Sequence, residues 1–451
     1  MAILSKCQTV PVSCKDYVHP WSESCVWASS TLLLPCLKES FRIYVTAYSV
    51  AMLLRGKVPN GKELAYTFLG IVRSCIFLTS HGVGYSGMAC FLRRVLGRYN
   101  FYTASFLPSF LSSILSILIE RPSRRVLLSL YVTNVASETL FRMAVSRKLI
   151  KPVQYGEVFV FSASSAFLLY IYRNHGLPKD PVYSLLKFLV GPYEEFGYTP
   201  SESLAEPPNH LRPETKKKIG TAQLKWIQFL NWFQTQVYLV KCGISHPSCP
   251  HPYSCSYYVL EGACRKFFYG YLTQLCIKLL MNSTKIVKSP SLALRIPFWP
   301  ETFRLAAMFS AFCGIFRYIS CWGRETCDKD LTTTAIPAGF VAGLSFCLYR
   351  DNSIALYFMW KLLQITYGLG VEKGYCIELP YAPVFFHAFS TAILFHTAIM
   401  EPKNLRLSYW NFLQAMSGGK IGEMSRDAFD AYGLESSKQL SDLLARVKAK
   451  K

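Results

Sequence analysis

Charged side chains are scarce in this chain, and acidic ones are the scarcest. Asp, Glu, Lys and Arg make up 17% of the 451 residues, whereas a soluble domain usually carries about a quarter. Four stretches contain no charged side chain at all: 74–92, 99–119, 331–349 and 379–400. Each stretch is close to the ~20 residues that a helix needs to cross the hydrocarbon core of a membrane. These runs exclude an ordinary soluble protein and predict an integral, multi-pass α-helical membrane protein.

Acidic residues number 27 against 49 basic residues, so the formal net charge is +22. The basic residues do not form one patch, because they stand in small clusters beside the apolar runs, as at Arg93, Arg94 and Arg98. Such clusters at helix ends suit snorkelling to anionic headgroups. We therefore expect membrane lipids with anionic headgroups as partners, and no nucleic acid. Because successive loops are all basic, the positive-inside rule does not orient the chain.

The sequence also lacks the local motifs of common enzyme sites. Neither a Gly-x-Ser-x-Gly nucleophile elbow nor a His-Glu-x-x-His metal motif occurs. We therefore expect no catalytic residues and predict that the protein is not an enzyme. The segment Met1 to Ser24 has no apolar core of the kind that a secretory signal needs. We expect insertion into the membrane to use internal segments.

Several residues recur at a nearly constant offset and indicate an internal duplication. His19-Pro20 returns as His246-Pro247, since 246 − 19 = 227, and Phe161-Ser162 returns as Phe389-Ser390, since 389 − 161 = 228. Each half has four apolar segments: 74–92, 99–119, 126–146 and 156–172, then 305–323, 331–349, 353–371 and 379–400. We predict an all-α, multi-pass transmembrane helical bundle built from two internal repeats, with about eight spanning helices plus interfacial amphipathic helices. If 41–54 and 267–280 also cross the membrane, each repeat has an odd number of spans. The two repeats then have opposite orientations in the membrane, as in some transporters.

Composition divides the chain into successive regions. They are a Cys/His-rich N-terminal entry (1–37), a first membrane repeat (38–193), a polar Pro-rich linker (194–223), an amphipathic helix with a second Cys/His-rich entry (224–256), a second membrane repeat (257–419) and a polar tail with an amphipathic helix (420–451). The helix after the linker has Trp226 and Trp232 among its apolar residues, and Lys225 and Lys241 flank it. This pattern favours a helix in the headgroup region, and packing against the bundle explains it equally well.

Cysteine and histidine gather in the second Cys/His-rich entry. The members of this group are Cys242, His246, Cys249, His251 and Cys255. Thiolates and imidazoles at this density suit Zn²⁺, which takes four N or S ligands in a tetrahedral shell. A structural zinc site is one interpretation, with no other cofactor expected, and a disulfide-stapled or simply reduced turn is the other. The first half carries a sparser version of the same pattern, with Cys7, Cys14, His19 and Cys25.

Glu138 and Arg142 are four residues apart, so on a helix they share one face and can pair. An ionisable residue at membrane depth is costly and by default indicates a function, such as lining a polar pathway or binding a lipid headgroup. An ion pair that locks helix packing is the structural alternative. Gly339 and Gly343 form a Gly-x-x-x-Gly row, which lets helix backbones approach closely, within one chain or in a homo-oligomer.

The stretch Glu120-Arg-Pro-Ser-Arg-Arg125, followed by Ser137-Glu-Thr-Leu-Phe-Arg-Met143, resembles the most characteristic part of the transmembrane protein 135 family. Supporting matches are Gly156-Glu-Val158, Ala338-Gly-Phe-Val-Ala-Gly343, Leu405-Arg-Leu-Ser-Tyr-Trp-Asn-Phe-Leu413 and the cysteine-rich start. The resemblance implies a multi-pass protein of mitochondrial and peroxisomal membranes. It also implies a link to mitochondrial fission–fusion balance, through the dynamin-related fission GTPase, and to peroxisome organisation and lipid handling. It transfers no catalytic or ligand-binding residue.

Two functions stay open on this evidence. The first is a non-enzymatic organelle membrane protein that regulates mitochondrial fission/fusion balance and peroxisome organisation or lipid handling. It predicts that the linker Glu194 to Gln223 or the C-terminal helix contacts partners. The alternative is a carrier or channel for a lipid or small metabolite, with a site between the two repeats. It predicts that Glu138 and Arg142 face a cavity.

Overall fold

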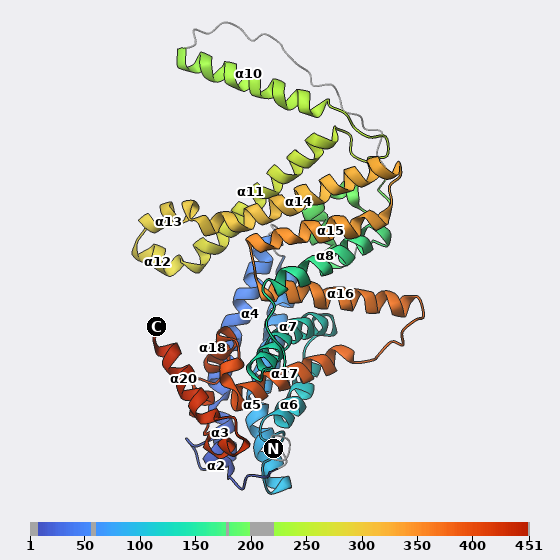
Figure 1. Cartoon of the computed structure of the whole chain (residues 1–451). Helices are drawn as coiled ribbons and strands as arrows, with labels where there is room; N and C mark the ends of the chain where they lie inside the picture. The colour runs from blue at the N-terminus through green and yellow to red at the C-terminus, as the bar shows by residue number, and fades with distance from the viewer. Residues whose placement is uncertain (1–7, 56–59, 177–179, 199–220, 450–451) are drawn as a thin grey trace. The chain divides into compact units, whose positions relative to one another are not determined.

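The computed structural model in Figure 1 describes residues 8–55, 60–176, 180–198 and 221–449. Over these residues the regular secondary structure is helical, apart from one isolated antiparallel bridge between Val10 and Tyr99. Within these described ranges, four helical segments are long and apolar enough to cross a membrane: Gly61–Leu96, Ser291–Cys327, Asn352–Glu372 and Ala382–Met400. The predicted all-helical membrane class is therefore confirmed. The count of about eight spans and the internal duplication stay predictions.

The chain divides into two compact units, of which the first comprises Met1–Pro152 and Tyr367–Lys451. Its helices are α2 (Cys14–Tyr17), α3 (Cys25–Thr31), α4 (Leu33–Arg55), α5 (Gly61–Leu96), α6 (Phe106–Ile119), α7 (Pro122–Ser146), α17 (Ala382–Met400), η5 (Pro402–Asn404), α18 (Leu407–Met416), α19 (Lys420–Glu423), η6 (Asp427–Tyr432) and α20 (Ser436–Ala449). Helix α5 packs against α4 and α6, and α17 packs against α6 and α7. The last apolar segment of the sequence thus packs against two helices from the N-terminal third.

The second unit is Val153–Thr366. Its helices are α8 (Gly156–Asn174), α9 (Pro181–Val190), η1 (Pro192–Glu194), α10 (Thr221–Lys241), α11 (Cys255–Met281), α12 (Ser283–Lys288), α13 (Ser291–Arg295), η2 (Ile296–Phe298), α14 (Pro300–Cys327), η3 (Thr332–Thr334), α15 (Ala335–Gly343), η4 (Leu344–Leu348) and most of α16 (Asn352–Glu372). Helices α11 and α14 lie side by side, as do α8 and α15 (Figure 1). The predicted amphipathic helix after the linker is present as α10, and its residues 231–240 are exposed.

Each of the eight apolar segments expected from the sequence contains helix, but the second is shorter than expected. Segment 99–119 becomes helical only at Phe106. The carbonyl oxygen of the Asn100 side chain accepts hydrogen bonds from the backbone N–H groups of Tyr102 and Thr103, at 3.0 and 2.8 Å. Such local side-chain bonds offer the backbone an alternative to the helix. Helix α6 therefore begins after this turn.

Close helix packing in the second unit depends on two glycines of α15. A Cβ atom on Gly343 would lie 2.5 Å from the Cα atom of Ser162 in α8, and one on Gly339 would lie 2.8 Å from that of Ala166. Real Cβ atoms do not approach a backbone so closely, so only glycine fits at these two positions. The Gly-x-x-x-Gly row therefore serves close packing within the chain.

The C-terminal tail forms part of the core of the first unit. Phe429, Tyr432 and Leu443 are buried in the same cluster as Trp410 of α18. The buried guanidinium of Arg426 donates to the carbonyl oxygens of Ala398 and Ile399, at 3.3 and 3.2 Å, in the last turn of α17. These carbonyls lack partners within their own helix. The tail thus completes the C-terminal end of α17.

Candidate metal centres

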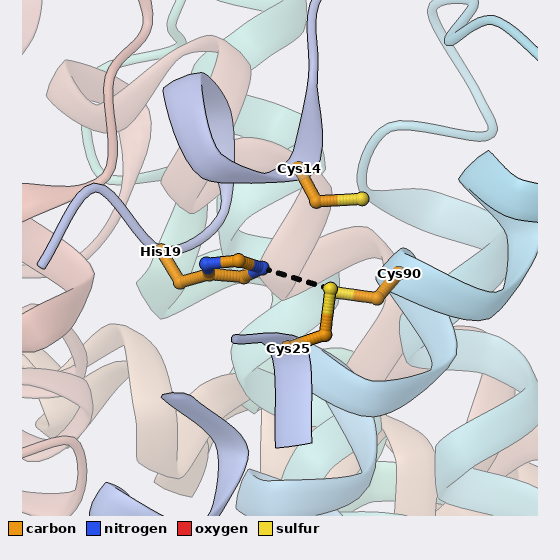
Figure 2. Close-up of side chains that lie close together, drawn as sticks. All are labelled: Cys14, His19, Cys25 and Cys90. Atoms are coloured by element: carbon orange, nitrogen blue, oxygen red, sulfur yellow. Dashed lines mark hydrogen bonds between the residues drawn. The ribbon is translucent and has the colours of Figure 1, made fainter. Parts of the chain in front are cut away.

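Four ligating side chains meet in the first unit. This N-terminal cluster consists of Cys14, His19, Cys25 and Cys90. Each offers one ligand atom, and these atoms all lie within 4.8 Å of one another. Figure 2 shows the side chains converging from α2, the loop after it, the start of α3, and α5. His19 and Cys90 are buried, so these two residues are shielded from solvent.

Helix caps place the first and third ligands. Cys14 and Cys25 are each the first residue of a short helix, and each follows a serine. Ser13 accepts a hydrogen bond from the backbone N–H of Asp16 at 3.1 Å, and the backbone N–H of Trp27 donates to Ser24 at 3.4 Å. A serine cap satisfies an N–H group that the first turn leaves without a partner. The caps fix where each short helix begins and hence where its cysteine points.

The chain before these helices is tied to the C-terminal end of α5. Val10 and Tyr99 exchange two backbone hydrogen bonds, at 2.7 and 3.1 Å. The Nε atom of Arg93 donates to the carbonyl oxygen of Val12 at 2.7 Å. Cys90 lies one turn before Arg93 on the same helix. The segment that carries three ligands is therefore held next to the helix that carries the fourth.

The orientation of His19 leaves its Nε2 atom directed at the thiols. Its Nδ1 atom lies 2.8 Å from the carbonyl oxygen of Ser22, and its Nε2 atom lies 3.3 Å from the Sγ atom of Cys25. A carbonyl oxygen only accepts, so Nδ1 carries the proton and Nε2 offers a lone pair. A backbone carbonyl on the second ring nitrogen is the usual arrangement of a metal-binding histidine.

A second cluster with the same composition lies in the second unit. It consists of Cys249, His251, Cys255 and Cys321, whose ligand atoms again lie within 4.8 Å of one another. The Nδ1 atom of His251 donates to the carbonyl oxygen of Tyr253 at 2.6 Å, and its Nε2 atom lies 3.4 Å from the Sγ atom of Cys321. A hydrogen bond from the Cys321 thiol is the main cause that lowers the pKa of Cys249, to about 4. The thiolate, which is the form that binds metals, is favoured there.

The two clusters are built alike. In both, the order along the chain is Cys, His, Cys, Cys, and the third ligand is the first residue of a helix with a serine cap. The fourth ligand lies on a long helix, α5 or α14, six residues before its last residue, because 96 − 90 = 6 and 327 − 321 = 6. In both, the histidine Nδ1 donates to a nearby backbone carbonyl. The shared construction indicates a shared role.

The distances fit a tetrahedral metal site better than a disulfide. Two thiolates at the usual Zn–S distance of about 2.3 Å lie about 3.8 Å apart on a tetrahedron, and the Sγ atoms of Cys249 and Cys255 are 3.8 Å apart. A disulfide requires about 2.05 Å, and all fifteen cysteines among the described residues are free. Three sulfurs and one imidazole nitrogen form a common ligand set of structural Zn²⁺. Both clusters can therefore hold zinc.

Residues 11–145 match the family model of the N-terminal cysteine-rich region of Transmembrane protein 135. This part of the chain is therefore similar to that region of the transmembrane protein 135 family. The match confirms the resemblance over this range, and together with the apolar helices it supports a multi-pass membrane protein. No solved structure matches the chain. The matched range contains all four residues of the N-terminal cluster, so this one stretch of the chain supplies a complete set of ligands.

The structure brings together three of the five sequence-predicted ligands, Cys249, His251 and Cys255. Cys242 is exposed and lies outside the cluster, and the Nε2 atom of His246 lies 3.2 Å from a carboxylate oxygen of Asp328. Sequence reasoning missed Cys321 and Cys90. Both stand in apolar segments, where cysteine is typical as a small hydrophobic residue. Both lie six residues before the last residue of a helix, but this shared position can be recognised only once the bounds of the helices are known. Cys7 of the sparser pattern lies outside the described residues.

Glu138 and Arg142 lie on one face of α7, as their spacing predicts. The Nη2 atom of Arg142 donates to Glu138 Oε1 at 2.5 Å, and the Nη1 atom of Arg406 lies 3.6 Å from Glu138 Oε2. Glu138 is buried. A second pair, between Arg147 and Glu401, joins the end of α7 to the chain after α17. These contacts tie α7 to its neighbours and favour the packing role.

A buried ionic network lies beside the second cluster. Both carboxylate oxygens of Glu194 accept hydrogen bonds from Arg324, at 3.1 and 2.6 Å, and Arg173 lies 3.6 Å away. The Tyr258 hydroxyl also donates to Glu194, and its ring stacks on His251 with centroids 4.3 Å apart. Burial alone would raise the pKa of Glu194, but the two arginines and these hydrogen bonds lower it to about 2. The network keeps Glu194 ionised and orders the wall behind His251.

The first unit also contains a small cavity of about 60 Å³ at the N-terminal segment and α18. Its lining is mostly apolar, and it includes Trp21, Cys36 and Met416. Lys420 is its charged side chain and already pairs with Glu423 at 2.8 Å. Glu138 and Arg142 do not line this cavity. It is therefore not the polar pathway that a carrier with those two residues needs.

Proposed function

We propose that the chain belongs to the transmembrane protein 135 family and is a non-enzymatic protein of mitochondrial and peroxisomal membranes. Its role would be to regulate mitochondrial fission/fusion balance, with the dynamin-related fission GTPase as partner, and peroxisome organisation or lipid handling. The observation that carries the proposal is the family match over residues 11–145. The location, the partner and the role are what this membership suggests.

The chemistry of the described sites supports a non-enzymatic role. A catalytic zinc site has three protein ligands and leaves a fourth position for water or substrate, whereas a structural site uses four protein ligands. Each cluster here offers four. The buried carboxylates of Glu138 and Glu194 are paired with arginines. These features are typical of groups that hold helices together.

A structural zinc ion at the second cluster is part of this proposal. Its ligands would be Cys249, His251, Cys255 and Cys321. With all four positions filled by protein, the ion would fasten the loop before α11 to α14. Elemental analysis of the purified full-length protein tests it. We expect Cys321→Ser to lose one zinc per chain and Cys313→Ser, a buried cysteine of α14 outside the cluster, to lose none. Equal zinc content in the two variants would contradict the proposal.

Helix α20 has an exposed face that a partner can reach. Leu443 faces the core, whereas Lys438, Asp442 and Arg446 are exposed. Charge reversal on this face leaves the buried side chains in place, which deletion of the tail would not. The linker residues 199–220, the other region expected to contact partners, lie outside the described residues.

The experiment expresses variants in cells from which the endogenous protein has been removed. Mitochondrial length and peroxisome number are then measured, together with the location of the tagged chain. We expect the wild type to restore both measures and Lys438→Glu/Arg446→Glu to fail. Lys285→Glu/Lys288→Glu is the matched control, because it makes the same change of charge on α12, another exposed helix. If removing the protein changes neither organelle, the proposed function is wrong.

A further inference from the structure

We propose that the N-terminal cluster is a second zinc centre, in which one Zn²⁺ fastens the N-terminal segment to α5. The ligands are Cys14, His19, Cys25 and Cys90. This inference extends the structural zinc of the second cluster to the family's cysteine-rich region, and it does not depend on the organelle role.

The geometry of the ligands carries the proposal. The four ligand atoms lie within 4.8 Å of one another, and they come from three helices and one loop. The Nε2 atom of His19 faces the sulfurs because Nδ1 is held by the carbonyl oxygen of Ser22. Three sulfurs and one nitrogen complete the tetrahedral shell of a structural zinc site. A site with all four positions filled by protein has no place for substrate.

The surroundings hold the ligands in place independently of any ion. The hydroxyl of the buried Tyr17 donates to the carbonyl oxygen of Ala104 at 2.8 Å, between the first two ligands in sequence. The hydroxyl of Tyr99 lies 3.8 Å from the Sγ atom of Cys14. A hydrogen bond from Tyr99 to this sulfur supports the thiolate as an outer-shell partner. Such a prearranged site loses little freedom when it binds the ion.

A disulfide is a poorer explanation of the same cluster. One disulfide would use two of the three thiols and leave the third thiol and the imidazole without a role. The arrangement of His19 would also be unexplained, since an imidazole contributes nothing to a disulfide. A zinc ion uses all four groups. It also cross-links Cys25 to Cys90 across 65 residues, since 90 − 25 = 65.

The proton balance of binding is simple. Zn²⁺ replaces the protons of three thiols, and the neutral imidazole contributes its Nε2 lone pair, so three protons leave the site. The Zn²⁺ charge and three thiolates leave one net negative charge. No oxidant or reductant is needed. Binding is therefore expected to weaken at acid pH, where protons compete for the thiolates.

The first test is the zinc content of the purified full-length protein in detergent. We expect two zinc ions per chain in the wild type and one in Cys90→Ser. Cys75→Ser is the matched control, because Cys75 is buried on the same helix, outside the cluster, and it should retain two. Cys321→Ser should lose the other zinc, so a failure of either site is seen separately. If Cys90→Ser retains as much zinc as Cys75→Ser, the proposal is overturned.

A second measurement covers the case in which Cys90→Ser does not fold. The wild-type protein is alkylated before and after removal of zinc with a chelator, and the modified cysteines are identified by mass spectrometry. We expect Cys14 and Cys25 to be protected before chelation and reactive after it. Cys264, which is exposed and outside both clusters, should react in both states. Cys14 and Cys25 that react equally before chelation, or that become reactive only after reduction, would overturn the proposal.

Discussion

The Nε2 atom of His251 lies 3.4 Å from the Sγ atom of Cys321, although seventy residues separate them in the chain. The contact joins the loop before α11 to the last two turns of α14. Tyr258 links this contact to Glu194, because its ring stacks on His251 and its hydroxyl donates a hydrogen bond to Glu194. The second cluster and the buried ionic network therefore form one connected arrangement.

Cys321→Ser should lower the stability of the second unit through loss of zinc. A bound ion stabilises the folded state as long as it does not bind the unfolded state equally well. We expect the Tm of the wild type in detergent to fall on chelation and the Tm of Cys321→Ser to be low and unaffected by chelator. Cys313→Ser, buried on the same helix, should respond to chelator like the wild type. An unchanged wild-type Tm on chelation would contradict this prediction.

Glu194→Gln should destabilise the second unit. The substitution removes the charge that two buried arginines share, and breaking a buried pair costs about 3–5 kcal/mol. Glu423→Gln, at the more exposed pair with Lys420, should cost less than about 1 kcal/mol. Urea unfolding in detergent, followed by circular dichroism, measures both changes. Equal losses for the two variants would show that the network contributes little.

The same carboxylate gives stability a pH dependence. The folded-state pKa of Glu194, about 2, is lower than its ordinary value of 4.5. Its contribution is therefore complete above about pH 4.5 and is lost as the pH falls toward 2. We expect the Tm of the wild type to fall more steeply over this range than that of Glu194→Gln. Parallel Tm curves for the two proteins between pH 5 and about 3 would contradict the assignment.

Gly343→Ala should loosen the contact between α15 and α8. The added methyl group would meet the backbone of Ser162, which is not free to move aside as a long side chain is. Overpacking of this kind costs about 1–3 kcal/mol. Gly368→Ala on α16 is the control, since a Cβ atom there meets nothing within 4 Å. Thermal unfolding in detergent should rank Gly343→Ala clearly below Gly368→Ala, and equal Tm values would contradict the close approach.

The sequence predicts which segments are helical because length and lack of charge suffice for that. It predicts that Gly339 and Gly343 face another helix, but not that this helix is α8, since many helices offer small residues. Cys90 and Cys321 could not be found by spacing, because each ligand is brought in from a distant helix. Composition places Glu194 in the polar linker. Its burial depends on arginines that lie far away in the sequence and are recognised as partners only in the folded chain.

Glu138→Gln distinguishes the packing role of α7 from a transport pathway. In the structure the Glu138 carboxylate is buried between Arg142 and Arg406. Loss of a hydrogen-bonded charge of this kind costs about 1.5–3 kcal/mol, so we expect a lower Tm. We expect the flux of fatty acyl, sterol and small anionic probes across the membrane of vesicles that contain Glu138→Gln to be no slower than with the wild type.

The control for this prediction is Glu157→Gln, whose partner Arg350 is half exposed and lies 3.6 Å away. This partly exposed pair, at a longer distance, should contribute less than about 1 kcal/mol, so the Tm should stay near that of the wild type. A protein-dependent flux that collapses in Glu138→Gln and persists in Glu157→Gln would contradict the packing role. Such a result would assign Glu138 to a carrier site. Loss of packing alone would lower the Tm of the protein and would not stop one probe while others still pass.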